Sequence, residues 1–240
     1  MVLATRSNSR TQQAFTLVEM LVVIAILAIL ASLLLPALAR AKDKGRQAFC
    51  QNSLRQVGLA FQLYHGDYDD QFPAPGSKQR YGPQPEDWIW WQYGRGVSNS
   101  SIAKFVSGFN PKLFTCPSDR EAQDLQAQGS ITNEPYRYSY ALTSYDLQGE
   151  QNLGMSTIIT QDRKIYPFRA RSVIRPSAKL MLVEEDRATI DDPRWVPHGR
   201  VPNLVSPRHA KKGNVVFADG HLEIVTQDFG LNPTNSQPAL

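Results

Sequence analysis

The chain has 240 residues, of which 42% are hydrophobic and 20% are charged. This length and composition allow one membrane helix and one sizeable globular domain. The net charge is +4, but Arg6 and Arg10 supply two of these charges, so 4 − 2 = +2 remains beyond residue 14. A balance this small indicates no nucleic-acid partner, and two cysteines permit at most one internal disulfide.

The first predicted element is a helix over residues 15–39. Its sequence is FTLVEMLVVIAILAILASLLLPALA, with Ser32 as the only polar residue between Met20 and Leu35. A helix of this length spans about 37 Å, enough to cross a bilayer core of about 30 Å. Glu19 is an acid inside this run, and an intramembrane acid indicates a functional site. The alternative interpretation is a buried core helix.

A secretory signal peptide is a second alternative for the same segment. The stretch at 36–41, PALARA, could be read as an A-x-A-like cleavage site. An ordinary signal would be cut after its apolar segment and would not carry an acid such as Glu19 inside that segment.

The residues Ala14-Phe15-Thr16-Leu17-Val18-Glu19 resemble the cleavage and methylation motif of type IV prepilins and type II secretion pseudopilins. The resemblance implies that a prepilin peptidase cuts between Ala14 and Phe15 and that the new N-terminus at Phe15 is methylated. Glu19 would be the fifth residue of the mature chain and Pro36 the twenty-second, as is usual in that family. Ala14 departs from the family, which usually has Gly before the cut.

The charges around the apolar run conflict with this resemblance. Arg40, Lys42, Lys44 and Arg46 follow the run and outnumber the two leader arginines, which by the positive-inside rule favours a cytoplasmic C-terminal domain. The resemblance implies the opposite orientation, and we adopt it: residues 1–14 form the leader peptide, and the domain lies outside.

The helix is predicted to continue over residues 40–68, with a kink where Pro36 removes a backbone donor. Its apolar residues fall on two nearly opposite stripes. The first stripe, Leu38, Ala41, Gly45, Ala48, Phe49, Leu59 and Leu63, could face neighbouring subunits; the second, Cys50, Leu54, Val57, Phe61, Tyr64 and Tyr68, would face the chain's own domain. The alternative is a helix buried on both sides within one monomer.

A loop rich in proline follows the helix. The acidic group Asp67, Asp69 and Asp70 lacks the regular spacing of a calcium loop, so a solvated helix end is favoured. Trp88, Trp90 and Trp91 form the densest aromatic patch, which could stack on sugar or nucleobase rings but is more typical of core.

Cys116 lies in a segment, FTCPSD, that resembles a recurrent segment of large pseudopilin-like proteins. Because Cys50 lies on the domain-facing stripe, a Cys50–Cys116 bridge is geometrically feasible and would contribute about 4 kcal/mol in the chain-entropy model. Two buried free thiols are the open alternative. No metal site is expected, since the two cysteines are distant and have no flanking histidine.

Strands are predicted near residues 136–145, 156–160 and 180–183, and residues 186–208 are predicted to be loop-like. A terminal hairpin is predicted at 214–226, because Asp219-Gly220 between apolar runs favours a two-residue type I′ turn. That turn would set Val215 opposite Ile224 and Phe217 opposite Leu222, giving one shared apolar face.

The same region, from His209 to Asp219-Gly220, resembles the processing-associated element of pseudopilin-like proteins, a His followed by nine residues and Asp-Gly. His209, Asp219 and His221 could also be read as a metal or acid/base set. The turn already accounts for Asp219 and Gly220, so a structural role is favoured. For His209 we expect a hydrogen bond that ties the preceding loop to the turn.

The predicted fold is therefore α+β: a long N-terminal helix packed on an antiparallel sheet within a periplasmic domain at 69–240. The predicted function is a pseudopilin-like subunit of a type II secretion or type IV pilus-like filament, anchored in the bacterial inner membrane. Its partners would be the prepilin peptidase/methyltransferase and other pilin-like subunits, with no cofactor and no catalysis. The alternatives are a membrane-tethered binding module for carbohydrate or DNA and, third, a periplasmic enzyme.

Overall fold

The computed structural model describes residues 16–76, 83–92, 95–120, 136–144, 154–160, 162–198 and 202–239. The chain divides into two compact units. Unit 1 is Met1–Lys44 and unit 2 is Gly45–Leu240. Ala14 and Phe15, the predicted cleavage site, lie outside the described residues.

Helix α1 (Leu17–Asp67) is the longest element and contributes to both units. Pro36 lies inside it, and the helix continues on both sides of the proline. The helix ends where Asp69 and Asp70 adopt positive φ values of 49° and 63°, a conformation that Asp tolerates better than most residues. The predicted long N-terminal helix is confirmed.

The main sheet of unit 2 has five strands in the order β5-β1-β4-β6-β7. Their bounds are β1 Tyr140–Thr143, β4 Leu180–Glu184, β5 Arg194–Trp195, β6 Gly213–Phe217 and β7 Leu222–Val225. Neighbouring strands are antiparallel except β1 and β5, which are parallel. The segment at 186–208, predicted as a loop, contributes this short edge strand β5. A second, two-stranded sheet pairs β2 (Ile158–Ile159) with β3 (Ile165–Tyr166).

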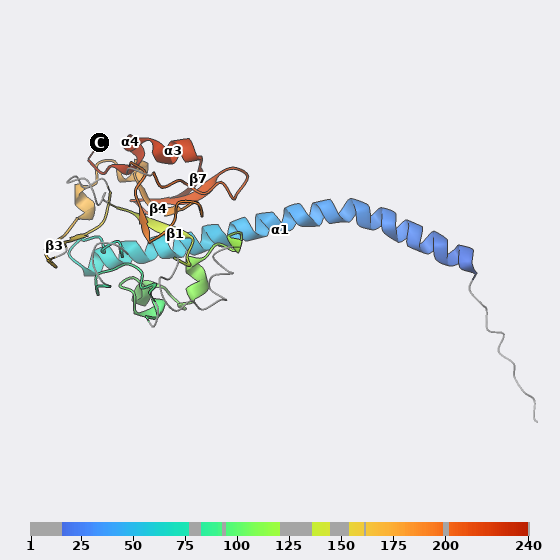
Figure 1. Ribbon diagram of the computed structural model, residues 1–240, viewed down its shortest axis with the longest axis horizontal. Coiled ribbons are helices and arrows are strands. Elements are labelled where there is room, and N and C mark those ends of the chain that lie inside the picture. Colours follow the sequence, from blue (N-terminus) through green and yellow to red (C-terminus); the bar gives the residue numbers. More distant parts are fainter. Residues whose placement is uncertain are drawn as a thin grey trace, which may run out of the picture. The chain divides into compact units, whose positions relative to one another are not determined.

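Short helices fill the connections. Within the described segments, five are 3₁₀ helices: η1 Val97–Asn99, η2 Ala103–Phe105, η3 Pro111–Phe114, η4 Ala170–Ser172 and η5 Pro176–Ala178. Two short α-helices, α3 (Gln227–Leu231) and α4 (Pro233–Ser236), follow β7. Figure 1 shows α3 and α4 on one side of the main sheet and the distal half of α1, residues 45–67, on the other.

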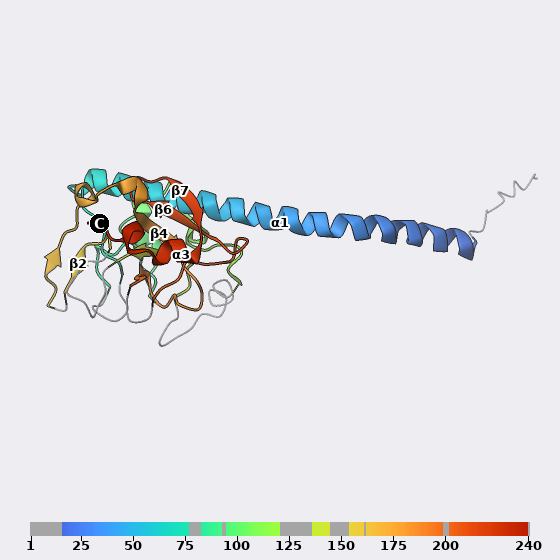
Figure 2. The ribbon, with the colours of Figure 1, turned by 90° about the horizontal axis from the view of Figure 1, so that it is seen from above.

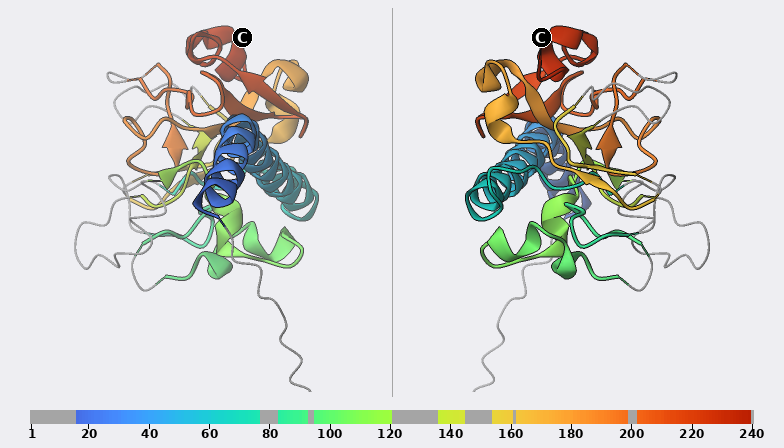
Figure 3. Two further views of the ribbon diagram at one scale, coloured as in Figure 1. Left: turned by 90° about the vertical axis from the view of Figure 1, so that its right-hand side faces the viewer. Right: turned by 90° about the vertical axis from the view of Figure 1, so that its left-hand side faces the viewer.

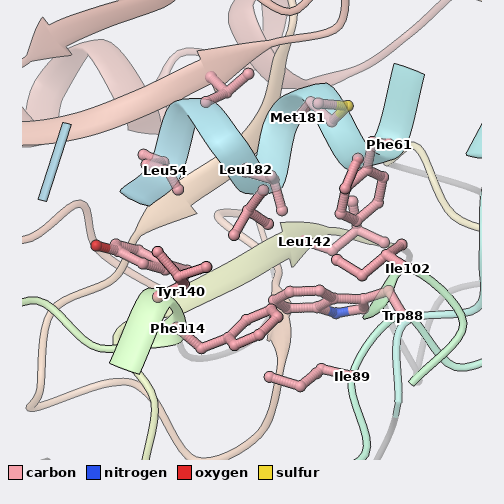
Figure 4. Close-up of a cluster of buried hydrophobic side chains, with 14 of the residues drawn as sticks. Leu54, Phe61, Trp88, Ile89, Ile102, Phe114, Tyr140, Leu142, Met181 and Leu182 are labelled. Carbon is pink, nitrogen blue, oxygen red and sulfur yellow. The ribbon is translucent and has the colours of Figure 1, made fainter. Parts of the chain in front are cut away.

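The inner strands β1, β4 and β6 are buried on both faces, so they read as nearly continuous apolar runs. The edge strand β7 leaves Glu223 exposed. One face packs on α1: Tyr140, Leu142, Leu182 and Val216 join Leu54 and Phe61 in the larger core cluster (Figure 4). The other face, with Ala141, Val183, Val215 and Phe217, packs around Trp195 and Phe229 of α3. A bulge between Leu180 and Leu182 turns Met181 and Leu182 to the same cluster.

The helix and sheet approach each other most closely at Gly58. A Cβ atom built on Gly58 would lie 2.9 Å from Cγ1 of Val216 on β6, so the absence of a side chain is what permits this spacing. A long N-terminal helix and an antiparallel-rich sheet make an α+β, pilin-like fold, as the sequence predicts.

Candidate functional site

The start of α1 is closed by a capping box between Thr16 and Glu19. The backbone N–H and the hydroxyl of Thr16 donate to Glu19 Oε2 at 2.8 Å and 2.7 Å. The Glu19 N–H donates back to Thr16 Oγ1 at 3.3 Å. In this motif a Thr at the cap and a Glu three residues later satisfy each other's exposed donors. Glu19 thus has a local role that the prepilin resemblance did not suggest.

The apolar half of α1 is exposed along its length. Every residue from Leu17 to Leu35 is exposed, and none of the most apolar stretch of the helix is buried. Among the described residues, α1 is the one helix that is long and apolar enough to cross a membrane. The alternative interpretation, a buried core helix, is therefore wrong.

The distal half of α1 carries the two predicted stripes. The domain-facing stripe is buried from Cys50 through Leu54, Val57 and Phe61 to Tyr64. Tyr68, predicted on this stripe, lies beyond the end of the helix and is 40% exposed, with its ring stacked on Tyr64 at 4.1 Å.

The opposite stripe stays exposed, so the helix is not buried on both sides of one monomer. Phe49, Leu59 and Leu63 are 43%, 58% and 47% exposed. Figure 2 shows the distal half of α1 along one side of unit 2, and in the end views of Figure 3 the other elements of unit 2 do not enclose it. An exposed apolar stripe of this kind is typical of an interaction surface.

A buried polar cluster lies where the C-terminal motif meets the sheet, and Glu184 of β4 is its centre. Glu184 Oε2 accepts from the backbone N–H and the side-chain amide of Asn214 at 3.1 Å and 2.8 Å. Glu184 Oε1 lies 3.2 Å from Nη1 of Arg208 and 3.2 Å from Nε2 of His209. Glu184 is fully buried and His209 nearly so.

Arg208 links Glu184 to the segment around Cys116. Its Nη2 lies 3.2 Å from Oδ2 of Asp119, and the Ser139 hydroxyl donates to the same oxygen at 2.8 Å. The Cys116 N–H in turn donates to Ser139 Oγ at 2.9 Å. The FTCPSD segment is therefore tied by hydrogen bonds to the C-terminal motif.

These contacts set the ionisation of Glu184. Burial acts to raise the pKa of its carboxyl group, but the hydrogen bond from His209, the charge of Arg208 and the bond from Asn214 outweigh burial and hold the pKa below its ordinary value. The carboxylate is the charged form that a buried site tolerates only with such partners.

Cys50 and Cys116 form a disulfide with Cα atoms 5.0 Å apart. It joins α1 to the segment after η3 and is fully buried. His209 lies against it, with Nε2 at 3.4 Å from Cys116 Sγ. The sequence expectation for His209, a bond to the hairpin turn, is wrong: this imidazole contacts Glu184 and the cysteine pair instead.

A strained turn presents His209. His209 and Lys212 exchange backbone hydrogen bonds at 3.0 Å and 3.1 Å, and the two residues between them, Ala210 and Lys211, have φ values of 52° and 65°. Two positive φ values are those of a type I′ turn, here made by residues that adopt it at a cost.

The terminal hairpin has a different register from the one predicted. The pairs are Val216 with Leu222 and Val215 with Glu223. The Gly220 N–H donates to Phe217 O, the Phe217 N–H donates to His221 O, and Gly220 has φ 92°. These bonds define a three-residue loop with glycine in the left-handed position rather than a two-residue type I′ turn. The extra loop residue shifts the pairing, so Val215 and Phe217 lie on the face opposite Leu222.

Asp219 and His221 contact each other. Among the described residues, neither forms a hydrogen bond with His209. His221 Nδ1 lies 2.5 Å from Asp219 Oδ1, and both side chains are partly exposed. The turn is held to α1 by Gln62, whose amide donates to Ala218 O at 3.0 Å. The three residues of the enzyme hypothesis thus divide between two separate groups.

Two of the three tryptophans of the patch belong to the core, and Trp90 is half-buried. Trp88 is fully buried and Trp91 is 6% exposed, and the indole N–H groups of Trp88, Trp90 and Trp91 donate to the carbonyls of Pro193, Gln84 and Gly76. The acidic group at the end of α1 is also engaged: Asp69 pairs with Arg169 at 2.7 Å, and Asp70 accepts from the Arg171 N–H at 2.9 Å.

Sequence reasoning missed Glu184, Arg208, Asn214 and Asp119 as parts of the cluster. Glu184 ends an otherwise apolar strand, LMLVE. An acid at the end of such an apolar run is the sequence signal that could have pointed to a buried carboxylate. The partners of Glu184 lie 24 to 30 positions away in the sequence, so no local spacing marks them.

Comparisons with known proteins agree with the helix and the domain. Residues 9–35 match the prokaryotic N-terminal methylation motif, and residues 39–180, more than half of the chain, match the family described as protein of unknown function (DUF1559). The type II secretion system core protein G of Pseudomonas aeruginosa is 30% identical over 88 residues, which are 33% of the chain and 60% of that protein. The chain thus spans less than two thirds of the length of this curated relative. No solved structure matches the chain. The methylation motif and this similarity identify the chain as pseudopilin-like.

Proposed function

We propose that the chain, which belongs to the family described as protein of unknown function (DUF1559), is a structural subunit of a filament. A prepilin peptidase would cut it between Ala14 and Phe15 and methylate Phe15. The mature subunit would then assemble with other pilin-like subunits into a type II secretion or type IV pilus-like filament.

The observation that carries the proposal is the exposed apolar helix directly after a methylation motif. The motif covers residues 9–35, and every residue from Leu17 to Leu35 is exposed. Water is a poor solvent for so much apolar surface. A bilayer before assembly and the helices of sister subunits after assembly are two environments that would cover it.

Glu19 suits a role between subunits as well as its role in the cap. Both Thr16 donors bond to Oε2, and among the described residues no hydrogen bond reaches Oε1. Cleavage before Phe15 would create a free amine four residues from Glu19. In the low dielectric of packed helices, that amine on one subunit would pair with Oε1 of Glu19 on a neighbour and set the axial register.

The exposed stripe Phe49, Leu59 and Leu63 supports the same proposal. It extends the apolar surface of α1 along unit 2, on the side of the helix away from the core. A helix buried within one subunit would not need this stripe, whereas a helix packed among sister helices would cover it.

For location we propose a single pass through the bacterial inner membrane, with the leader in the cytoplasm and residues 69–240 in the periplasm. The buried Cys50–Cys116 disulfide supports the periplasmic placement, because disulfides persist in oxidising compartments. We give the disulfide more weight than the positive-inside rule, which favours a cytoplasmic domain because of Arg40, Lys42, Lys44 and Arg46.

We propose a structural rather than a catalytic role. Of the tryptophans that suggested a binding module for carbohydrate or DNA, Trp88 and Trp91 are packed in the core, and Trp90 is half-buried with its indole N–H bonded to the Gln84 carbonyl. The grouping that suggested an enzyme divides between two places. No further observation favours either alternative.

The first test is mass spectrometry of the mature N-terminus in cells that carry the peptidase. A methylated Phe15 is expected, with Ala14→Gly as a variant that matches the family's usual residue. An intact N-terminus in both the wild-type chain and the glycine variant would contradict processing.

The second test separates the two roles of Glu19. The capping box accepts Gln as well as Glu, so Glu19→Gln keeps the cap and removes the charge, whereas Glu19→Ala removes both. If Glu19 pairs with a neighbour's amine, both variants should be processed normally yet be lost from the sedimenting filament fraction on an immunoblot. Wild-type filament yield from Glu19→Gln would restrict Glu19 to capping.

A further inference from the structure

Four side chains that can bind a metal ion converge in the core of unit 2. They are Cys50 of α1, Cys116 after η3, Glu184 of β4 and His209 before β6. One ligand atom from each lies within 4.8 Å of the others, and all four residues are buried. Sequence spacing predicted no metal site, because the histidine and the carboxylate come from segments far from both cysteines.

The distances fit a tetrahedral ion once the sulfur–sulfur bond is open. Zinc bonds of about 2.0–2.3 Å give ligand-to-ligand edges of roughly 3.3–3.8 Å in a tetrahedron. His209 Nε2 already lies 3.4 Å from Cys116 Sγ and 3.2 Å from Glu184 Oε1. His209 Nε2 thus faces both the Cys116 sulfur and the Glu184 carboxylate. When the S–S bond opens, the two sulfurs can separate and supply the remaining two ligands.

The buried charge also balances in both redox states. A disulfide is neutral, and a Zn²⁺ ion with two thiolates is neutral in sum. Replacing one by the other therefore leaves the charges of Glu184, Arg208 and Asp119 as they are in the structure. Two thiolates, one imidazole and one carboxylate form a donor set typical of zinc.

We propose that the reduced chain binds one Zn²⁺ ion through Cys50, Cys116, His209 and Glu184, and that oxidation of the two cysteines releases it. In the oxidation, two thiolates form the S–S bond and pass two electrons to a disulfide-bearing oxidant, such as a thiol–disulfide oxidoreductase. The S–S bond of the oxidant breaks, and its two sulfurs take two protons from solvent to give the dithiol. Zn²⁺ leaves to solvent. The His209 proton moves from Nδ1 to Nε2, where it bonds to Glu184.

Such an ion would hold the domain together before the bridge exists. It would join α1, the Cys116 segment, β4 and the His209 turn at the same four points that the oxidised cluster joins. The subunit could thus fold around the cysteine pair while its thiols are reduced, with the thiolates protected from wrong pairing.

The test uses the full chain in detergent. The chain is reduced in denaturant with a phosphine and refolded with reductant and equimolar zinc. Free metal is then removed by gel filtration, and zinc is measured by mass spectrometry. About one zinc per chain is expected, falling at least tenfold after oxidation to the disulfide. His209→Asn should lower the zinc content at least tenfold, whereas the matched control His221→Asn, which changes the other histidine of the motif, should retain it.

Cobalt gives a readout that needs no variant. Reduced wild-type chain refolded with Co²⁺ should show a near-ultraviolet sulfur-to-cobalt charge-transfer band and the visible bands of a tetrahedral ion, and both should vanish on oxidation. Circular dichroism checks that each variant folds. Reduced wild-type chain without bound zinc or without the charge-transfer band overturns the proposal, as does equal zinc in the oxidised chain or in a folded His209→Asn variant.

Discussion

Glu184 allows a quantitative test of the buried cluster. Changing Glu184 to Gln keeps the shape of the side chain but removes its negative charge. The carboxylate oxygens that accept hydrogen bonds from Asn214, Arg208 and His209 are then replaced by a neutral amide. Arg208 then keeps Asp119 as an acidic partner and loses the other. Breaking a buried charge pair by neutralising one member costs about 3–5 kcal/mol, a large part of a typical stability of about 5–15 kcal/mol.

Urea unfolding at pH 7 measures this cost. The fragment spanning residues 45–240 contains the whole cluster and its core, and buried Trp88 and Trp195 make fluorescence a suitable signal. A loss of about 4 kcal/mol with a slope of about 2 kcal/mol per molar urea lowers the midpoint by about 2 M. The control is Glu223→Gln, an exposed carboxylate on β7, for which a change within about 0.5 kcal/mol is expected.

The pH dependence gives the same test a second arm. Because the folded pKa of Glu184 is lowered, its contribution is present above the unfolded value of about 4.3 and is lost as pH falls through the folded value. The gap between wild type and Glu184→Gln should therefore be constant from pH 7 to about pH 5 and shrink at lower pH. A midpoint shift below about 0.5 M at pH 7 would refute the argument that the cluster depends on this charge.

Three further changes test other parts of the fold by the same urea assay. Lys211→Gly should raise the free energy of unfolding by about 1 kcal/mol, because Lys211 has a left-handed φ of 65° that glycine adopts without strain. The control Lys212→Gly, at the next residue, should not raise it. Gly58→Ala should lower the free energy of unfolding, because overpacking against Val216 costs about 1–3 kcal/mol. The matched control is Gly66→Ala in the last turn of α1, where nothing lies within 4 Å of an added Cβ atom, and it should not lower the free energy of unfolding. Equal losses from both variants would contradict the packing argument. Burial lowers the pKa of His65 to about 4. The neutral imidazole is therefore favoured in the folded state, and the free energy of unfolding should fall by about 3 kcal/mol as the pH drops from 6.5 to below 4. His65→Gln should remove this pH dependence.

The sequence predicted the helix well because the signal is local. An apolar run followed by a buried stripe from Cys50 to Tyr64 has a period that only a helix satisfies. The strands at 140–143 and 180–184 were also evident, because apolar residues crowd into short segments there. In these places composition and periodicity point to the same structure.

The hairpin register was wrong because Asp219-Gly220 fits two turns. Gly220 takes its positive φ in either case, and only the bonds of Phe217 to Gly220 and His221 distinguish a three-residue loop from a two-residue one. Patterning could not correct the error, since β6 is apolar on both faces and a shift by one residue still buries a valine.

The buried cluster could not be predicted, because its members meet only in the folded domain. Glu184, Arg208 and Asp119 each resemble ordinary surface charges in the sequence. The pairing becomes visible when β6 lies beside β4 and brings Asn214 under the carboxylate.

The position of β6 makes the domain depend on the part of it that is synthesised last. This strand lies between β4 and β7, directly against Gly58 of α1, and Gln62 of the helix holds the turn that follows it. A nascent chain interrupted before residue 213 would leave the part of α1 around Gly58 uncovered and Glu184 without Asn214. Proteases and chaperones that recognise exposed apolar surface would therefore distinguish finished subunits from incomplete ones.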